Sequence, residues 1–415
     1  MRIFSQSILS SAVLLVAALS MLHVGSVDGN PVELDVPAAP GSRDPNLTLG
    51  DDGTAYLSWL EPVLGEGMAL RLARQTNGQW STPTTVVEGS DWFISWADAP
   101  GVAAFGERSI VAWWLEINGD GPYSYDLILA LSADGGESWS EPFPVHRDGT
   151  PTQHGMPSFL AWPDGRLFVT WLDGRVNAQG ADGVSGSALP TGDMTLRSAL
   201  VDENGALSDE AELDARVCTC CPTEAVRAGD AVIVTYRDRS DQDVRDMAVR
   251  RHDTEGWRDA VPLHRDGWEI AGCPINGAAL ASDGQRIAAA WFTAARDQPN
   301  LLLAFSNDGG RTFSAPVDID DGRPIGRTDI VLLADGTALV SWLESTAFGE
   351  ELRYRRVLDD GSPKPSRTLV RSATGRTMGF PRLLRQGDSV LIAWTESGPP
   401  TRVRTALVHP GERSR

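Results

Sequence analysis

The sequence predicts an all-β protein folded as a seven-bladed β-propeller of four-stranded blades, and three observations predict it. A short phrase, an apolar run that ends on an aromatic residue and usually an acid, recurs seven times. The same order of turns and apolar runs surrounds each copy. The length of 415 residues is long for one core but ordinary for a radial array whose units pack on their neighbours.

The recurring phrase sets the period of the repeat. Its copies are AYLSWLE at 55–61, IVAWWLE at 110–116, LFVTWLD at 167–173, VIVTYRD at 232–238, IAAAWFT at 287–293, ALVSWLE at 338–344 and VLIAWTE at 390–396. Their aromatic residues follow one another at intervals of 51 to 65 residues. That period fits one four-stranded blade of a propeller.

Each phrase is expected to be the second strand of a blade. The first strand precedes it and usually opens with a proline, and the sixth unit has Asp329 in that place; the prolines are Pro45, Pro100, Pro157, Pro222, Pro274 and Pro381. A third alternating run follows the phrase, as at 127–132, and then a fourth, as at 143–145. Runs rich in Val, Ile, Leu and aromatic residues between Gly, Asp and Pro are typical of strands.

The last unit predicts how the ring closes. It ends after RVRTALV at 402–408 without a fourth strand, whereas VELDV at 32–36 precedes the first unit and belongs to no other. Pairing these two strands would remove two exposed sheet edges. We therefore expect a single propeller domain over residues 31–410, closed by an N-terminal strand that completes the last blade.

Residues 1–29 are expected to form a secretory signal peptide, cleaved near 26–30. Arg2 precedes the apolar run ILSSAVLLVAALSML at 8–22, and small residues follow around Gly25 and Ser26. This run is short for a membrane span, and no later segment could cross a bilayer. The expected location is outside the cytoplasm, either periplasmic or extracellular, with no membrane contact after cleavage.

The charge of the chain excludes two classes of partner. The net charge is -20 and the isoelectric point is near 4.7, which argues against nucleic acid and anionic membranes. An acidic surface keeps an exported protein soluble. We expect a monomer.

Two turns between third and fourth strands carry a more specific signature. They read SADGGESW at 132–139 and SNDGGRTF at 306–313. The carboxylates of Asp134 and Asp308 can accept backbone N–H groups across the turn, while the glycines supply positive φ. These turns resemble the Asp-box, or bacterial neuraminidase repeat, of the sialidase superfamily, and the resemblance covers roughly residues 42–409. It implies a structural role for the box, so neither aspartate is a catalytic candidate.

The resemblance extends only in part to the chemistry of sialidases. It implies an arginine triad for the substrate carboxylate, a tyrosine nucleophile activated by a glutamate, and an aspartate acid. Arg43 stands where the first arginine of the triad is expected. At the place of the nucleophile, however, the chain has 327–329 (RTD) and 380–382 (FPR), and its five tyrosines lie elsewhere. A retaining mechanism without its nucleophile is not expected to turn over. No catalytic residue is therefore assigned, and the candidates for a hydrolase would be Arg43, Tyr236 and Asp238.

The four cysteines carry the most unusual chemistry. Cys218, Cys220 and Cys221 precede Pro222, and Cys273 precedes Pro274, so that Cys221 and Cys273 each stand before the proline that opens an inner strand. Met156 holds the same place before Pro157. Inner strands line the channel of a propeller, so this shared register predicts that three neighbouring blades place sulfur at one level of the channel.

A soft metal ion is the first interpretation of this cluster. The predicted ligands are Cys218, Cys220, Cys221, Cys273, Met156 and, as the preferred nitrogen donor, His154. Thiolate, thioether and imidazole donors favour copper as Cu(I), with zinc next. The alternative is two disulfides, because export exposes thiols to an oxidising compartment and four is an even number. Both interpretations stay open at this point.

Three further features lie on the same face of the predicted propeller. His146 and His264 each open a His-Arg-Asp-Gly stretch, where an exposed histidine beside a turn is the expected outcome. The acids that end the phrases could form a ring that attracts a cation or a basic partner, or they could cap the strands by accepting backbone N–H groups, which we favour. The glycine-rich connection 174–192 is either a lid or an indel-tolerant surface loop.

The function predicted first is that of an exported binding protein with a copper site or redox-active thiols at the channel mouth, where a protein or carbohydrate ligand would bind. One alternative is a sialidase-type glycoside hydrolase, similar to exo-α-sialidases, that acts on acidic sugars. Another is a structural partner-binding module stapled by disulfides.

Overall fold

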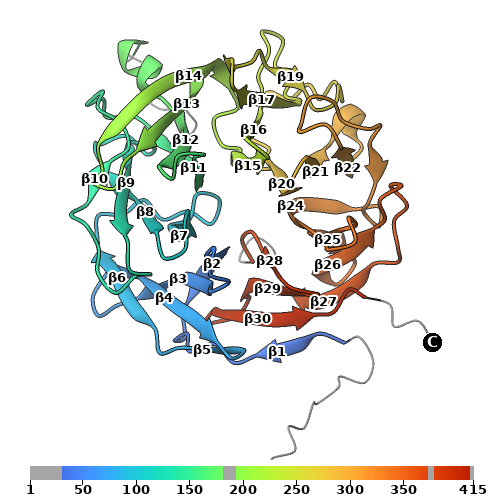
Figure 1. The fold of residues 1–415 in the computed structure, drawn as a ribbon, viewed down its shortest axis with the longest axis horizontal. Helices are drawn as coiled ribbons and strands as arrows, with labels where there is room; N and C mark the ends of the chain where they lie inside the picture. The colour runs from blue at the N-terminus through green and yellow to red at the C-terminus, as the bar shows by residue number, and fades with distance from the viewer. Residues whose placement is uncertain (1–29, 181–192, 373–377, 412–415) are drawn as a thin grey trace, which may run out of the picture.

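A computed structural model describes residues 30–180, 193–372 and 378–411. Seven antiparallel sheets stand around a central channel as the blades of a propeller (Figure 1). The predicted fold class, all-β with seven four-stranded blades, is confirmed. The predicted signal peptide lies outside the described residues.

The first three blades follow one another along the chain. Within each blade, the strands run in chain order from the inside of the ring outwards. Blade one contains β2 (Arg43–Leu49), β3 (Ala55–Pro62), β4 (Met68–Thr76) and β6 (Thr84–Gly89), with β5 (Gln79–Trp80) also paired to β4. Blade two contains β7 (Gly101–Ala104), β8 (Ile110–Ile117), β9 (Tyr125–Ser132) and β10 (Phe143–Pro144). Blade three contains β11 (His154–Ala161), β12 (Leu167–Asp173), β13 (Met194–Val201) and β14 (Leu207–Val217).

The next three blades repeat this order. Blade four contains β15 (Glu224–Ala228), β16 (Ala231–Arg237), β17 (Met247–Asp253) and β19 (Val261–Pro262), with β18 (Gly256–Trp257) also paired to β17. Blade five contains β20 (Ala278–Asp283), β21 (Arg286–Thr293), β22 (Asn300–Ser306) and β23 (Val317–Asp318). Blade six contains β24 (Pro324–Leu332), β25 (Ala338–Thr346), β26 (Gly349–Val357) and β27 (Arg367–Ser372).

The seventh blade joins the two ends of the chain. Its inner strands are β28 (Arg382–Gln386), β29 (Ser389–Glu396) and β30 (Arg402–Val408), and its outer strand is β1 (Val32–Leu34). The strands β1 and β30 are antiparallel, with Val32 opposite Leu407 (Figure 1). Every strand of the seventh sheet but its outermost therefore comes from the C-terminal end.

The hydrophobic core lies in layers between successive blades. The seven phrases form the second strands, and five of their tryptophans are among the largest fully buried side chains: Trp59, Trp114, Trp171, Trp291 and Trp342. One such layer combines Ala288 and Leu303 of blade five with Ile330 and Trp342 of blade six. Because each layer is shared by two blades, each blade is stabilised by its neighbours.

The Asp-box turns have the geometry that the sequence predicts. The Oδ1 atom of Asp134 accepts the backbone N–H groups of Glu137 and Ser138 at 2.9 and 3.0 Å. The Oδ1 atom of Asp308 does the same with Arg311 and Thr312 at 3.0 and 2.9 Å. Hydrogen bonds from the Ser138 hydroxyl and from the turn hold the pKa of Asp134 well below its usual range. Both aspartates are structural, as predicted.

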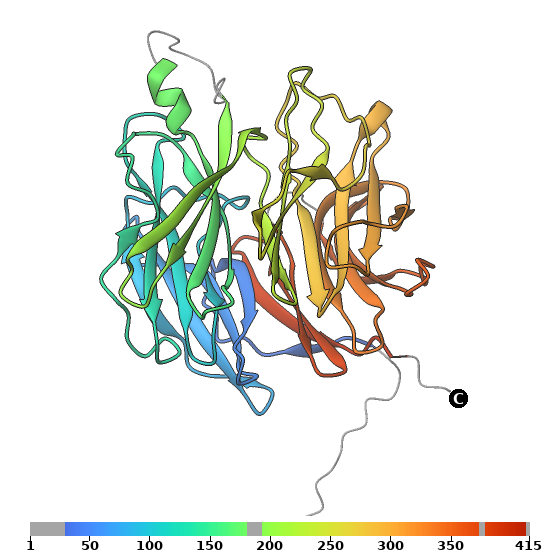
Figure 2. The same ribbon diagram turned by 45° about the horizontal axis from the view of Figure 1, so that its top comes forward.

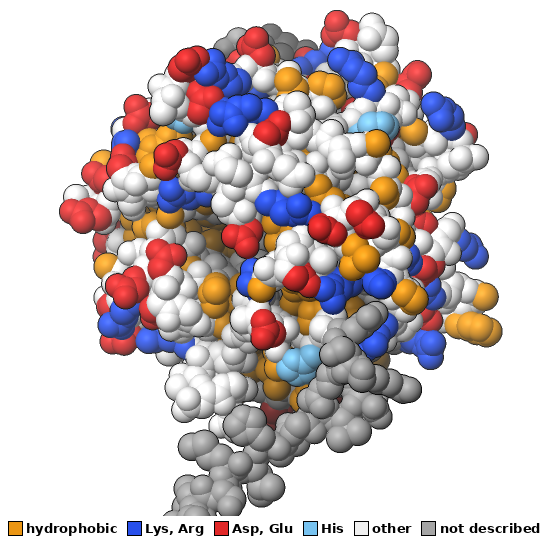
Figure 3. All heavy atoms as spheres, turned by 45° about the vertical axis from the view of Figure 1, so that its right-hand side comes forward, with side chains coloured by type: hydrophobic (Ala, Val, Ile, Leu, Met, Phe, Trp, Pro, Cys, Tyr) orange, Lys and Arg blue, Asp and Glu red, His pale blue; other side chains and the backbone are white. Residues whose placement is uncertain are grey.

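The connections add two short 3-10 helices, η1 (Arg175–Gly180) and η2 (Ala295–Asp297). Figure 2 shows η1 standing beyond the strands of blade three, at one face of the ring. Within the described ranges, no helix combines the length and apolar character of a membrane span. Acidic and basic side chains are interspersed over the side of the molecule drawn in Figure 3.

Candidate functional site

The four cysteines come together at the boundary of blades four and five. Three belong to the connection from β14 to β15, and Cys273 belongs to the connection that leads to β20. Cys220 and Cys273 form a disulfide with Cα atoms 6.1 Å apart. The Sγ atom of Cys218 lies 3.0 Å from that of Cys221 and 3.9 Å from that of Cys220. The cluster is therefore one disulfide beside one buried pair of free thiols.

Backbone contacts fix the connection that carries three of the cysteines. The N–H group of Cys218 donates to the carbonyl of Arg237, the last residue of β16, at 2.9 Å. From blade three, Gln153 Nε2 donates to the Thr219 carbonyl at 3.0 Å, and the Thr223 hydroxyl donates to the Met156 carbonyl at 2.9 Å. The connection that carries Cys218, Cys220 and Cys221 is thus held by blades three and four.

Two buried guanidinium groups make this site favourable for a thiolate. Arg245 Nη1 lies 3.6 Å from Cys218 Sγ. Arg237 is only 1% exposed and donates to the carbonyls of Asn276, Arg245 and Phe292, which ties blade four to blade five. The Cys221 thiol and then these two arginines lower the pKa of Cys218, whereas burial and the neighbouring Cys218 raise that of Cys221. The pair therefore favours one thiolate, on Cys218, with the proton on Cys221.

The structure does not bring His154 to the sulfur atoms. The His154 ring is fully buried between blades two and three, where its nitrogens face Asp126 at 3.4 Å and Asp148 at 3.1 Å. Burial acts against its charge, but these carboxylates prevail and raise the pKa of His154 to about 9. His154 stays away from the sulfur atoms because it is the first residue of β11, and at this position its side chain is directed toward blade two rather than blade four.

Met156 lies nearer to the cysteines than His154 does, but its side chain belongs to the wall of the central cavity. It is buried in the same hydrophobic cluster as Cys220 and also lines the central cavity. Its register differs from that inferred from the prolines: the ladder of β11 is interrupted between Gly155 and Ser158, and Met156 has a φ of 53°. An interruption of this kind is a β-bulge, which turns side chains away from the simple alternation.

A central cavity of about 80 Å³ lies where the inner strands begin. Its walls include four acids from four different blades and one arginine: Asp44, Asp98, Glu224, Asp329 and Arg382. Burial raises the pKa of Asp98 to about 7, against hydrogen bonds from the Met156 N–H and the Tyr125 hydroxyl that lower it. Burial likewise raises the pKa of Glu224 to about 8. None of these acids belongs to a repeated phrase, and among them only Asp329 stands out in the sequence, where it replaces the opening proline of the sixth unit.

The residues considered for a hydrolase do not converge in this cavity. Tyr236 is buried between blades, where its hydroxyl donates to Asp214 Oδ2 at 2.6 Å, and burial raises its pKa far above the usual range. Asp238 accepts the N–H of Arg239 at 2.7 Å, and Arg43 pairs with Asp44 at 3.7 Å. Of the described residues that line the cavity, none is a tyrosine, and Phe380 occupies the expected place of the nucleophile.

The acids that end the phrases have a partner in addition to the backbone N–H groups that were expected. Four of them accept the indole N–H of the tryptophan two residues earlier, at distances of 2.7 to 3.0 Å: Glu61, Glu116, Asp173 and Glu344. In blade five, where Thr293 replaces the acid, Trp291 donates instead to Asp266 at 2.8 Å. Backbone N–H groups are also accepted, as the capping interpretation predicts, by Glu61, Asp173, Asp238 and Glu344. Most of the acids are thus engaged in the blades rather than free as a ring.

The glycine-rich connection after β12 is only partly described, since residues 181–192 lie outside the described ranges. At its start, Arg175 of η1 binds Asp173 at 2.7 Å and approaches Asp148 at 3.3 Å. The choice between a lid and a tolerant surface loop stays a prediction.

Comparison with known proteins gives similarity to solved structures only. No family model and no curated protein matches the chain. A protein of unknown function from Dyadobacter fermentans is 15% identical, with a TM-score of 0.49 over 92% of this chain and 98% of its own. The leech intramolecular trans-sialidase is 10% identical, with a TM-score of 0.49 over 92% and 90%. The intramolecular trans-sialidase from Ruminococcus gnavus is 12% identical, with a TM-score of 0.45 over 89% and 94%.

The structure itself has seven radial blades and two Asp-box turns in register with them. The chain is a seven-bladed β-propeller whose second and fifth blades carry turns with the hydrogen bonds of an Asp-box.

Proposed function

We propose that this chain is an exported binding protein in which Cys218 and Cys221 hold one Cu(I) ion at the channel mouth. The observation that carries the proposal is the buried pair of free sulfur atoms, 3.0 Å apart, beside the Arg245 guanidinium. Soft thiolates select Cu(I) over harder ions. The face around the site would then recognise a protein or carbohydrate ligand.

The disulfide supports copper over zinc in this proposal. A structural zinc site takes four protein ligands, so zinc would need the sulfur atoms of Cys220 and Cys273 as well. Those two atoms are bonded to each other. Cu(I) needs only the two remaining thiolates, and the disulfide then acts as a staple between blades four and five.

The test is a titration of the mature chain with Cu(I) under anaerobic conditions, in competition with a chromogenic Cu(I) chelator. We expect one equivalent to bind, and we expect Cys218→Ser and Cys221→Ser each to weaken binding at least 100-fold. The double variant Cys220→Ser, Cys273→Ser is the matched control, because it removes two sulfur atoms of the same cluster and should keep the copper. Binding below one equivalent, or equal binding by all variants, would refute the copper site.

A redox role of the same pair is the second candidate, and one distance favours it. Cys218 Sγ lies 3.9 Å from Cys220 Sγ, which belongs to the disulfide. A Cys218 thiolate could attack Cys220, which would form a Cys218–Cys220 bond and release Cys273 as a thiolate without net oxidation. Mass spectrometry of non-reduced peptides distinguishes the two: a single Cys220–Cys273 linkage supports the staple, and a mixture of linkages supports exchange.

The hydrolase alternative has a separate test. It predicts release of a fluorophore from a sialoside or a uronide, and loss of this activity in Arg43→Ala. The central cavity suits binding better than retaining hydrolysis, since Phe380 cannot serve as a nucleophile there.

A further inference from the structure

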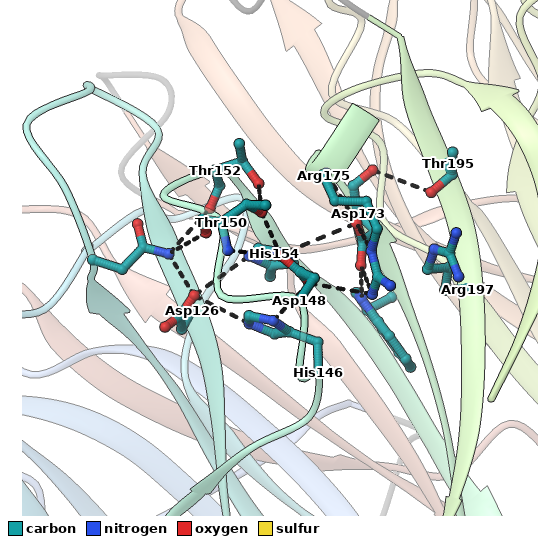
Figure 4. Close-up of polar contacts among 12 residues, drawn as sticks. Asp126, His146, Asp148, Thr150, Thr152, His154, Asp173, Arg175, Thr195 and Arg197 are labelled. Atoms are coloured by element: carbon teal, nitrogen blue, oxygen red, sulfur yellow. Dashed lines mark hydrogen bonds and ion pairs between the residues drawn. The ribbon is translucent and has the colours of Figure 1, made fainter. Parts of the chain in front are cut away.

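A second cluster of chemistry-bearing residues lies between blades two and three, apart from the cysteines. Asp126 stands at the start of β9, His146 and Asp148 follow β10, and His154 opens β11 (Figure 4). The two imidazole rings are stacked, with centroids 3.5 Å apart and planes 9° from parallel. The side chain of His146 is 3% exposed and that of His154 is 0% exposed.

Carboxylates face both ends of this stack. On one side, Asp126 Oδ1 lies 3.1 Å from His146 Nε2 and 3.4 Å from His154 Nδ1. On the other side, Asp148 Oδ2 lies 2.8 Å from His146 Nδ1 and 3.1 Å from His154 Nε2. The rings therefore present one pair of nitrogens to Asp126 and the opposite pair to Asp148.

Hydrogen bonds from the two imidazole rings to the carboxylates satisfy this arrangement poorly. Three of the four ring nitrogens are buried without a hydrogen bond of acceptable geometry to the described residues, namely both of His146 and Nδ1 of His154. A neutral imidazole carries one N–H, so one nitrogen of each ring would turn a lone pair toward a carboxylate. A charge on His154, which its raised pKa favours, satisfies that ring but still leaves one nitrogen of His146 with a lone pair toward a carboxylate, and charging both rings would stack two cations at 3.5 Å.

The side of Asp148 already holds a cation. Arg175 Nη2 lies 3.3 Å from Asp148 and 2.7 Å from Asp173. Asp126, in contrast, is 28% exposed and opens its side of the stack to solvent, while Asn118 donates a hydrogen bond to its Oδ1 atom. The carboxylates of Asp126, Asp148 and Asp173 thus gather around two imidazoles and one guanidinium, and the Asp126 side is the side open to a further cation.

The spacing of the donor atoms on the Asp126 side is close to the edges of a metal tetrahedron, and binding requires the two parallel rings to turn out of the stack so that both lone pairs point at one ion. Zinc bonds of about 2.0–2.2 Å to nitrogen and oxygen place neighbouring ligand atoms about 3.3–3.6 Å apart. The two oxygen-to-nitrogen distances are 3.1 and 3.4 Å. We propose that His146 Nε2, His154 Nδ1 and Asp126 Oδ1 bind one divalent transition-metal ion, with zinc as the best fit. The fourth position faces solvent beside Asp126.

Asp148 has a positioning role in this site. It accepts a hydrogen bond from His154 Nε2 and lies beside His146 Nδ1, so it favours the tautomer that leaves the opposite nitrogens free for the metal. Carboxylates commonly orient metal-binding histidines in this way, and their loss weakens binding about 10–100-fold.

The chain supplies a matched control for the site. His264 and Asp266 repeat the same His-Arg-Asp-Gly stretch ahead of blade five. There the histidine is 42% exposed and its Nδ1 pairs only with Asp266, at 2.7 Å. Asp266 also accepts the Trp291 indole N–H, so it serves the core of the blade.

The experiment is equilibrium dialysis of the full chain against Zn²⁺ or Co²⁺, followed by the visible absorption of bound Co²⁺. It uses the double variant Cys218→Ser, Cys221→Ser, which removes the free thiols and keeps this site separate from the copper proposal. We expect one equivalent of metal with a tetrahedral cobalt spectrum. In this background, His146→Asn and His154→Asn should weaken binding at least 100-fold, Asp148→Asn about 10–100-fold, and His264→Asn not at all.

The proposal fails if the parent double variant binds no metal, or if His146→Asn and His264→Asn bind it equally. Because His154 is fully buried, His154→Asn could unfold, and Asp126→Asn then carries the test since Asp126 is partly exposed. A rise of the melting temperature with Zn²⁺ in the parent, absent in Asp126→Asn, supports the site. An equal rise in both would overturn it.

Discussion

At the scale of single residues, the repeated phrase is explained by one buried hydrogen bond. Tryptophan is large enough to fill the space between two blades, but its indole N–H must find an acceptor there. Two residues later along a strand, a side chain points to the same face, and an acid at that position reaches the indole. Trp342 and Glu344 show this pairing at 2.7 Å, with both side chains buried.

Replacing Glu344 by leucine tests this explanation. The change leaves the Trp342 indole and the Arg323 N–H without their acceptor, so we expect a loss of about 2–4 kcal/mol in the free energy of unfolding. Glu396 is the matched control, because it binds Arg404 while the Trp394 indole has no partner in the described part of the chain. Glu396→Leu should change stability by less than about 0.5 kcal/mol in urea denaturation. Equal losses in both variants would contradict the role of the indole.

The raised pKa of Asp98 predicts that the free energy of unfolding depends on pH. Its pKa in the folded chain is about 7, whereas the ordinary value is 3.8, because burial opposes its charge. Between these values the folded state keeps a proton that the unfolded state releases, so stability falls as the pH rises through this window and then levels off. Asp98→Asn keeps the size of the side chain and the acceptor for the Met156 N–H.

The measurement for Asp98 is the free energy of unfolding of both proteins from pH 4 to pH 8. The original chain should lose up to about 4 kcal/mol more than Asp98→Asn over this range. Other buried acids, such as Asp44 and Glu224, contribute equally to both proteins, so the difference isolates Asp98. Parallel profiles would show that Asp98 is ionised in the folded state.

At the scale of elements, the starts of the inner strands shape the channel. The pairing of β2, β11 and β24 with their neighbours is interrupted at this point, and Asp44, Met156 and Arg327 adopt φ values of 53° to 54° there. Non-glycine residues rarely take this conformation, which is common at binding sites. The bulges place Asp44 and Met156 in the wall of the cavity, and they make the proline positions an unreliable guide to register.

The start of β11 contacts both proposed metal sites. Gln153 binds the cysteine connection through the Thr219 carbonyl, while the adjacent His154 faces blade two. Successive residues of a strand point to opposite faces, so the two side chains serve different interfaces. This alternation separates the sulfur donors from the imidazole donors.

At the scale of the whole molecule, the ring is closed by only three paired residues of the N-terminal strand. Val32, Glu33 and Leu34 lie opposite Leu407, Ala406 and Thr405. Leu34 and Val36 pack on the layer shared by blades one and seven. Without them, β30 would present an open edge to solvent and to other chains.

A chain that begins at Pro37 tests the closure. We expect a loss of about 2–5 kcal/mol in stability from the missing contacts of Leu34 and Val36, together with self-association through β30. Calorimetry and light scattering would measure the two effects. Glu33→Ala, which changes an exposed side chain and leaves the strand intact, should behave like the original chain. A truncated chain that stays monomeric and equally stable would show that the ring does not depend on β1.

The sequence by itself determined the number of blades, the second strand of each blade and the Asp-box turns, because these depend on local patterns that recur along the chain. Alternation, turn residues and the spacing of Trp59, Trp114 and their equivalents need no knowledge of distant contacts. The gathering of the cysteines was also foreseen, since equivalent connections of neighbouring blades must meet.

Only the tertiary structure decided how the side chains of the site are divided. It paired Cys220 with Cys273, left Cys218 beside Cys221, and placed His154 with His146 and Asp126. It also brought Asp98 and Glu224 into one cavity. The reason is physical: bulges shift the register at the mouth of the channel, and the interface that a side chain enters depends on the tilt of one blade against the next.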